Sequence, residues 1–85
     1  MLDPLPHHVY VLRCSDDTLY TGYTTDVDRR VREHDEGVAA KYTRGRTPVE
    51  LVHEETFETR SAAMSREAEI KAMTRDEKLG LIQRG

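Results

Sequence analysis

The segment HVYVLRCSDDTLYTGY, residues 8–23, decides the fold of this chain. Its first part, His8 to Cys14, is rich in β-branched and aromatic residues and carries apolar side chains on both faces, which predicts a central strand covered on both sides. Ser15 to Asp17 is a run of short polar residues that favours a turn, because such side chains bond to the nearby backbone. Strand-forming residues resume from Thr18 to Tyr23. The segment therefore predicts a β-hairpin.

A helix is predicted after the hairpin. Thr25 or Asp26 can cap its first turn, and Gly37 marks its end after about Glu36. The face turned to the sheet, at spacings of i, i+3, i+4 and i+7, would carry Val27, Arg30, Val31 and His34. Arginine and histidine are unusual on such a face, since burying a charged or polar group costs free energy unless the group is paired.

The rest of the chain predicts a loop, a third strand and two further helices. Residues 38–47 are small, basic and glycine-containing and indicate a loop, and Pro48 precedes a strand from Val49 to about Glu54. Thr59 would cap a helix that ends near Met73. The inward stripe of that helix would consist of Ala63, Glu67, Ile70 and Met73.

A capping box predicts the final short helix, with Thr74 at the cap and Glu77 three residues later. The residues of this helix expected to face inward are Leu79 and Ile82. The element order β-β-α-β-α-α indicates an α+β domain, a three-stranded antiparallel sheet flanked by helices, over residues 7–85. Residues 1–6 are expected to form an N-terminal tail.

Composition restricts the class of protein. At 85 residues the chain has room for one domain, and its 36% hydrophobic and 34% charged residues exclude both a disordered tail and a membrane protein. No apolar run approaches the roughly 20 residues of a membrane helix. The first residues lack the basic and hydrophobic regions of a signal peptide, and the single cysteine, Cys14, excludes an internal disulfide. We therefore expect a cytoplasmic protein with no membrane partner.

The net charge of −3 conceals an uneven distribution. Six basic and three acidic residues lie between Arg29 and Arg46. A basic segment is the kind of feature that attracts nucleic acid, although chance clustering on a solvated surface accounts for it equally well.

Several polar residues fall where a plain core would have apolar ones. They are the hairpin tyrosines Tyr10, Tyr20 and Tyr23, together with Arg30, His34 and Glu67. One interpretation is structural: Arg30 and Glu67 form an ion pair, His34 is a hydrogen-bonded boundary residue, and the tyrosines pack as strand residues. The other is chemical: a carboxylate holds a hard metal ion, an arginine stabilises charge on a phosphate, and a general base takes a proton from water.

These residues resemble those of the GIY-YIG nuclease family. Val9-Tyr10 and Tyr20-Thr21-Gly22, with nine residues between them, resemble the two strand motifs that name the family. The resemblance continues through Thr24, Arg30, His34, Glu67, Ile70-Lys71, the segment AKYTRGR at 40–46 and the segment PVEL at 48–51. The pattern is similar to that of compact stand-alone members of the family and covers roughly residues 8–82.

The resemblance implies a hydrolase, a metal-dependent endonuclease that cuts phosphodiester bonds of nucleic acid. DNA is the expected substrate. Tyr20 would be the general base nearest the attacking water, with Tyr10 beside it shaping the site. Arg30 would clamp the phosphate, and His34 would support the phosphate or the water. Glu67 would be the sole protein ligand of one Mg²⁺ or Mn²⁺ ion. Adjacent Arg29 is the less suitable arginine, because it points about 100° away on the helix.

Further residues would contact the nucleic acid itself. Gly22 would let backbone or substrate approach the strand. The basic residues of the loop, Lys41, Arg44 and Arg46, would contact backbone phosphates. Tyr42 would either stack on a base or anchor the loop. Tyr23 stands where some relatives carry a lysine near the metal, so the identity of the base stays open.

Other hypotheses remain at this point. His8 replaces the glycine or aromatic residue that usually begins the first motif, from which we expect altered packing only. The domain could keep the fold as a non-catalytic nucleic-acid-binding module, or serve as a structural domain in a repair or recombination complex. A zinc site is not favoured, because the four histidines and Cys14 lack the usual ligand spacing. Cys14 as a nucleophile is not favoured either. The oligomeric state stays open, with a monomer as one option.

Overall fold

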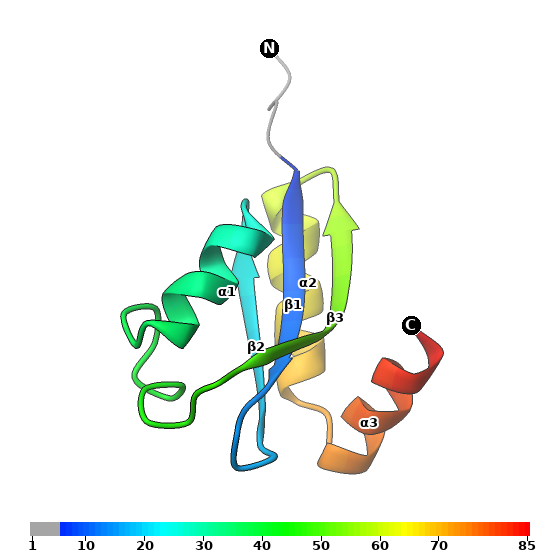
Figure 1. Cartoon of the computed structure of the whole chain (residues 1–85). Helices are drawn as coiled ribbons and strands as arrows, with labels where there is room; N and C mark the ends of the chain where they lie inside the picture. Colours follow the sequence, from blue (N-terminus) through cyan, green and yellow to red (C-terminus); the bar gives the residue numbers. More distant parts are fainter. Residues whose placement is uncertain (1–5) are drawn as a thin grey trace.

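The computed structural model describes residues 6–85, so that of the expected N-terminal tail only Pro6 lies within the described residues. The elements, in chain order, are β1 His7–Arg13, β2 Leu19–Thr24, α1 Val27–Asp35, β3 Glu50–Phe57, α2 Arg60–Lys71 and α3 Arg75–Arg84. The strands form one antiparallel sheet in the order β2-β1-β3 (Figure 1). The predicted α+β class and element order are confirmed.

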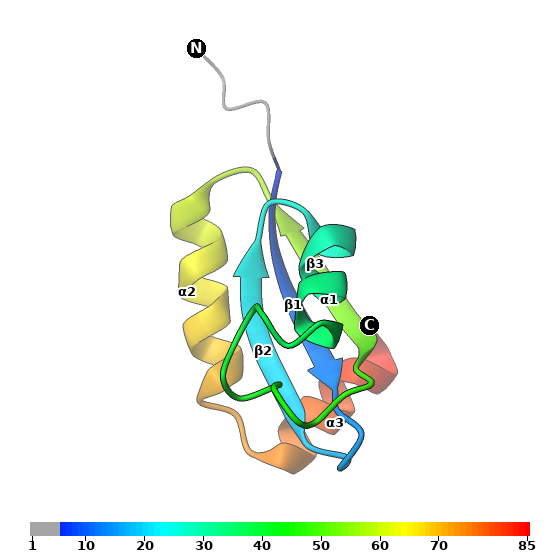
Figure 2. The same ribbon diagram turned by 60° about the vertical axis from the view of Figure 1, so that its left-hand side comes forward.

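The sheet separates two apolar layers, because successive side chains of a strand point to opposite faces. Val9 and Val11 of β1 pack against residues of α2 and α3. Tyr10 and Leu12 pack on the other face, where Val31 of α1 covers them. The helices accordingly lie on the two sides of the sheet (Figure 2). β1 is the central strand covered on both sides that the sequence predicts.

Local signals in the sequence place the helix starts. The Asp26 side chain accepts a hydrogen bond from the backbone N–H of Arg29 at the start of α1, and Thr59 does the same for Ala62 at the start of α2. The predicted capping box between Thr74 and Glu77 is formed at α3. These bonds satisfy backbone donors that have no partner within a helix.

Two predicted details of the fold are wrong. β3 begins at Glu50 and runs on to Phe57, beyond the predicted end at Glu54, because the first residues of β1 pair with its last ones. The buried residue of α3 is Leu81 and not Leu79, although Ile82 packs against the core as expected. Leu81 and Ile82 stand about 100° apart on a helix, so the face between them meets the core.

Within residues 6–85, no helix combines the length and the hydrophobicity that a membrane span requires.

Candidate active site

The predicted catalytic residues gather around β1 and β2, of which β2 is one of the two edge strands of the sheet. Tyr10 of β1 stands directly opposite Gly22 of β2, and its phenol lies over that glycine. A β carbon at position 22 would collide with the phenol oxygen of Tyr10. Gly22 is therefore needed for the close approach of a side chain of this domain, whereas the sequence suggested an approach of substrate or backbone.

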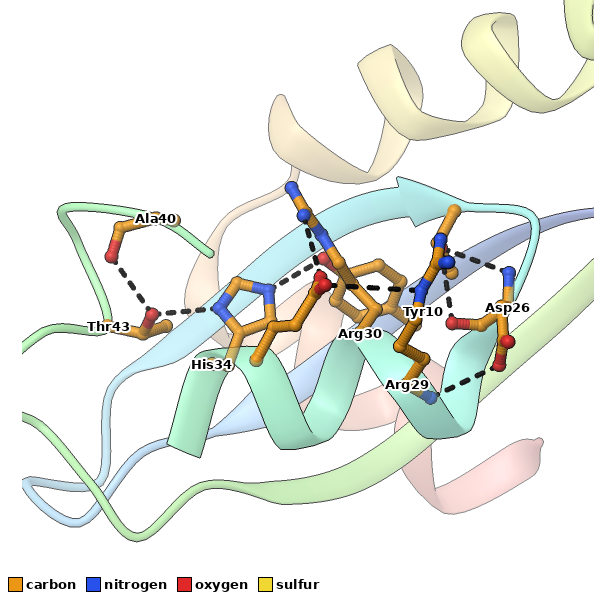
Figure 3. Close-up of polar contacts among 9 residues, drawn as sticks. Tyr10, Asp26, Arg29, Arg30, His34, Ala40 and Thr43 are labelled. Atoms are coloured by element: carbon orange, nitrogen blue, oxygen red, sulfur yellow. Dashed lines mark hydrogen bonds and ion pairs between the residues drawn. The ribbon is translucent and has the colours of Figure 1, made fainter. Parts of the chain in front are cut away.

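A chain of hydrogen bonds fixes the Tyr10 ring (Figure 3). The Tyr10 hydroxyl and the Nε2 atom of His34 are 2.8 Å apart, and the Nδ1 atom of His34 is 2.8 Å from the hydroxyl of Thr43. The Thr43 hydroxyl in turn donates to the backbone carbonyl of Ala40 at 3.2 Å. Tyr10, His34 and Thr43 are all fully or almost fully buried. We call this chain of bonds the relay.

The carbonyl at the end of the relay sets the direction of every bond in it. Because a carbonyl only accepts, the Thr43 proton points to Ala40, and the Thr43 oxygen accepts from Nδ1–H of His34. Nε2 of a neutral His34 then accepts from the Tyr10 hydroxyl. The imidazole thus has both nitrogens engaged and serves to hold the phenol in place.

The protonation states agree with this arrangement. Burial lowers the pKa of His34 below its ordinary value, and the nearby Arg30 charge lowers it further, so the imidazole is neutral at pH 7. Burial raises the pKa of Tyr10 to about 12, with the charges of Tyr20 and Glu67 adding to that rise. Tyr10 therefore keeps its proton at pH 7.

Arg30 extends from α1 to the Tyr10 phenol. Hydrogen bonds to Tyr10 and to Glu33 help to raise the pKa of the Arg30 guanidinium against the lowering effect of burial. Its Nη1 atom lies 3.1 Å from Oε1 of Glu33. Its Nε atom is buried and has no hydrogen-bond partner among the described residues. Adjacent Arg29 is more exposed and only reaches Glu33 at 3.9 Å, as its helical position predicts.

Glu67 comes to the site from α2, on the other side of the sheet. Its side chain is only 16% exposed, and its Oε2 atom is 3.3 Å from Nζ of Lys71. The ion pair between Arg30 and Glu67 that the structural interpretation required is absent from the described residues, since each pairs within its own helix. Glu67 nevertheless lies close enough to raise the pKa of Tyr10.

The donor set around Glu67 suits one kind of metal ion. Residues 6–85 contain no group of three or more His, Cys, Asp or Glu side chains that could hold a metal. A zinc site of several protein ligands does not fit this arrangement. A single largely buried carboxylate with one oxygen outside its ion pair fits a hard ion such as Mg²⁺, which keeps most of its water ligands.

A ladder of rings leads outward from the buried relay. The Tyr20 ring centroid lies 5.0 Å from that of His34 and 5.6 Å from that of Tyr42. The guanidinium of Arg46 lies 4.4 Å above the Tyr42 ring and also bonds to Asp16 at 2.6 Å. Within the described residues, the Tyr20 hydroxyl has no hydrogen-bond partner, unlike that of Tyr10.

Some predicted residues lie apart from this cluster. Tyr23 projects to the opposite face, where its hydroxyl is 2.7 Å from Nδ1 of His7 and its ring lies beneath Arg60. Lys41 is an exposed loop residue, and Arg44 donates to the backbone carbonyl of Gly37 at 3.2 Å.

Two residues that support the site, Thr43 and Glu33, were not predicted from the sequence. Thr43 sits in a basic loop where no local pattern distinguishes it. Glu33 precedes His34 by one position and resembles an ordinary surface charge, although its spacing of three from Arg30 permits an ion pair on a helix.

The GIY-YIG catalytic domain model matches residues 6–79 of the chain. The chain belongs to the GIY-YIG family. The UPF0213 protein of Haloquadratum walsbyi is 67% identical to this GIY-YIG domain over 79 residues, which cover 93% of this chain and 89% of that protein. The UPF0213 protein of Staphylococcus epidermidis is 54% identical over 79 residues, which cover 93% of this chain and 96% of that protein.

Solved structures agree with the family assignment. The solution NMR structure of the UPF0213 protein from Bacillus halodurans has a TM-score of 0.62 and 48% identity to this GIY-YIG domain, covering 93% of this chain and 84% of that one. A solution NMR structure of a protein from E. faecalis has a TM-score of 0.65 and 44% identity, and the match covers 99% of this chain and 90% of that one. The resemblance that the motifs predicted, to small single-domain GIY-YIG proteins, is confirmed.

Proposed function

We propose that this GIY-YIG domain is a metal-dependent endonuclease that hydrolyses phosphodiester bonds of nucleic acid, with DNA as the first substrate to test. The observation that carries the proposal is the Arg30 guanidinium beside the Tyr10 phenol: the side chain is 36% exposed, and its buried Nε–H has no partner among the described residues. A buried donor without a partner costs free energy, and an anionic phosphate oxygen is the acceptor that a guanidinium binds best.

Each residue of the relay has a role in presenting that guanidinium. Glu33 bonds to Arg30 at 3.1 Å, and the Tyr10 phenol lies close enough to influence the pKa of Arg30, so the guanidinium is oriented before a phosphate binds. His34 and Thr43 lock Tyr10 in place and are positioning residues. Arg30 stabilises the negative charge that develops on the phosphate oxygens as the attacking water bonds to phosphorus.

Tyr20 is the candidate general base. Its hydroxyl is not held by a hydrogen bond to another described residue, and its ring stands next to His34 and closer to the surface than Tyr10. It would take the proton of the attacking water as the water oxygen bonds to phosphorus and the bond to the leaving oxygen breaks. A phenol accepts a proton only as phenolate, so Tyr20 relies on nearby positive charge.

Glu67 would hold the Mg²⁺ or Mn²⁺ ion. When bound, such an ion supplies Lewis-acid stabilisation of the phosphate and lowers the pKa of its water. Glu67 contributes the one protein carboxylate, held in orientation by Lys71.

The loop after α1 would contact the nucleic-acid backbone. Arg46 lies on Tyr42, which itself lies beside Tyr20, and this supports a contact of Arg46 with a phosphate near the cleavage point. Lys41 is an exposed residue of the same loop and would contact a phosphate of the backbone. Arg44 is held to Gly37 and would act as a more distant charge. Tyr23 lies on the other face of the sheet, away from Tyr10 and Tyr20. Its contact with nucleic acid stays a prediction. The buried unpaired Cys14 suits a cytoplasmic protein.

Cleavage assays test the proposal directly. Labelled single-stranded, duplex and branched DNA and RNA are incubated with Mg²⁺, Mn²⁺ or EDTA. We expect metal-dependent cleavage that Arg30→Ala lowers by about 10²–10³-fold and that Arg29→Ala, its exposed neighbour, leaves nearly unchanged. No cleavage of any substrate, with binding unaffected by EDTA or by Glu67→Gln, would leave a non-catalytic nucleic-acid-binding module.

A further inference from the structure

A hollow lies on the surface next to the proposed site. It encloses about 200 Å³ and is lined by Thr18, Leu19, Tyr42, Arg75 and Lys78. Three separate parts of the chain thus contribute to it: the start of β2, the loop after α1, and the first turns of α3. Tyr42 joins it to the candidate active site, because the Tyr42 ring also contacts the Tyr20 ring.

The hollow carries two cations, Arg75 and Lys78, of which one has a carboxylate partner. Lys78 forms no ion pair among the described residues. Arg75 pairs with Asp17 at 3.1 Å, but both side chains are about half exposed or more, and such pairs contribute little and leave the cation accessible. Neither cation was among the residues that the sequence pattern indicated.

The hollow also has an aromatic wall. Tyr42 is 40% exposed, the highest value among the aromatic side chains of the described residues. Aromatic rings beside cations are the usual means of binding a single strand, since the rings contact bases or sugars and the cations contact phosphates. In a duplex the base faces are already stacked and are not offered to such a ring.

The hollow is small and open to solvent. Its volume of about 200 Å³ has room for a phosphate with its sugar or for one unstacked base.

We propose that this hollow binds one nucleotide of a single-stranded nucleic acid, next to the nucleotide whose phosphate lies at Arg30. Arg75 and Lys78 contact the phosphate, and Tyr42 contacts the sugar or base. The inference rests on the proposed function, because it places the substrate across the candidate active site, and it makes a single strand the preferred substrate class.

Binding measurements in EDTA test this subsite without cleavage. The probes are fluorescein-labelled oligothymidylates from dimer to dodecamer, a duplex dodecamer, and oligouridylates of the same lengths to separate RNA from DNA. The variants are Arg75→Glu with Lys78→Glu, and Lys78→Gln as a milder change should the first fail to fold. Arg84→Glu, on the same helix but outside the hollow, is the control matched in charge to Lys78→Glu alone, so the two single variants are compared with each other before the double variant is interpreted.

We expect the charge reversal to weaken binding of the longer single strands by about tenfold or more while the dimer is unaffected. The slope of log K against log salt concentration should also become shallower, by about 0.7 for each phosphate that the variant no longer neutralises. Weakening no greater than that caused by Arg84→Glu, or equal weakening at all lengths, would overturn the subsite.

The same data separate this inference from the proposed function. Length-dependent loss of binding in a protein that cuts no probe in Mg²⁺ or Mn²⁺ supports the subsite and contradicts the nuclease. Cleavage that is equally fast on single strands and duplexes and unaffected by the charge reversal supports the nuclease and contradicts the subsite. Absence of binding to every probe contradicts both.

Discussion

The phenol of Tyr10 occupies the space in which any other residue at position 22 would place its β carbon. Tyr10 and Gly22 are directly opposed across the β1–β2 ladder, so neither can move without disturbing the hairpin. The two strand motifs of the family are thus one packing unit in this domain: the tyrosine of the first motif needs the glycine of the second.

Gly22→Ala should therefore damage both stability and activity. The new methyl group forces the Tyr10 ring away from Nε2 of His34, and we expect a loss of about 1–3 kcal/mol in the free energy of unfolding. Urea denaturation measures this loss. Gly80→Ala is the matched control: a methyl group on Gly80 of α3 meets only ordinary contact, and the change should stabilise by roughly 0.5–1 kcal/mol. A destabilising Gly80→Ala, or a neutral Gly22→Ala, would contradict this account.

Thr43→Val should weaken the relay although valine has nearly the same shape. The substitution removes the acceptor of Nδ1–H of His34 and leaves that donor buried, at a cost of about 1–3 kcal/mol in unfolding free energy. Thr43→Ser keeps the hydroxyl and should retain most of the stability. Nitrogen-15 NMR of the imidazole provides a direct check, because protonated Nδ1 and unprotonated Nε2 are expected in the native protein. The opposite tautomer would contradict this account, because it would reverse both bonds of His34 and take the Thr43 proton away from the Ala40 carbonyl.

Stability should fall as the pH is lowered through the ordinary pKa of histidine. The pKa of folded His34 lies below 6.5, so near and below that pH the unfolded chain binds a proton that the folded chain does not. The contribution of neutral His34 is fully present above about pH 6.5 and is lost below it, by at most about 1.4 kcal/mol per pH unit. Melting temperatures at about pH 7.5 and about pH 5.5 measure the effect.

His34→Gln is the variant that isolates this contribution. Glutamine does not titrate, so the variant should be less stable at neutral pH and should lose less stability than the native protein on acidification. The carboxyl groups of Glu55 and Asp16, whose pKa values are lowered by their hydrogen-bond partners Arg66 and Thr18, lose their contributions only below their ordinary values of 4.5 and 3.8. An identical pH dependence in the variant would show that another group is responsible.

Glu67→Gln should separate activity from folding. We expect kcat/KM for metal-dependent cleavage to fall by at least about 100-fold, because the amide is a poor ligand for a hard cation. Stability should change by less than about 1 kcal/mol, since the pair with Lys71 is partly exposed. Glu69→Gln, which alters an exposed carboxylate on the same helix, should leave cleavage unchanged. Equal Mg²⁺ dependence in both variants would exclude Glu67 as the ligand.

Features encoded by neighbouring residues were predictable from the sequence. The hairpin turn and the caps at Asp26, Thr59 and Thr74 each depend on residues within three or four positions, so local patterns suffice. The placement of Tyr10, Arg30 and His34 together followed from strand and helix periodicity combined with the family motif.

Features that depend on how the loop folds back were not predictable. Thr43 reaches His34 only because residues 38–47 return over the end of α1, and nothing in the local sequence marks that path. The hollow at Arg75 and Lys78 depends on where α3 packs. The same packing determines that Leu81 and not Leu79 is the buried leucine of this helix. These positions arise from tertiary packing, which overrides local preference.

β2 is an edge strand, and among the described residues it pairs only with β1. Free backbone groups on such an edge invite a strand of another molecule, and charged side chains nearby oppose that encounter. Arg30 of α1 and Glu67 of α2, the charged residues of the proposed site, come from helices on opposite faces of the sheet (Figure 2). Variants that remove either charge are therefore to be checked for self-association as well as for loss of cleavage.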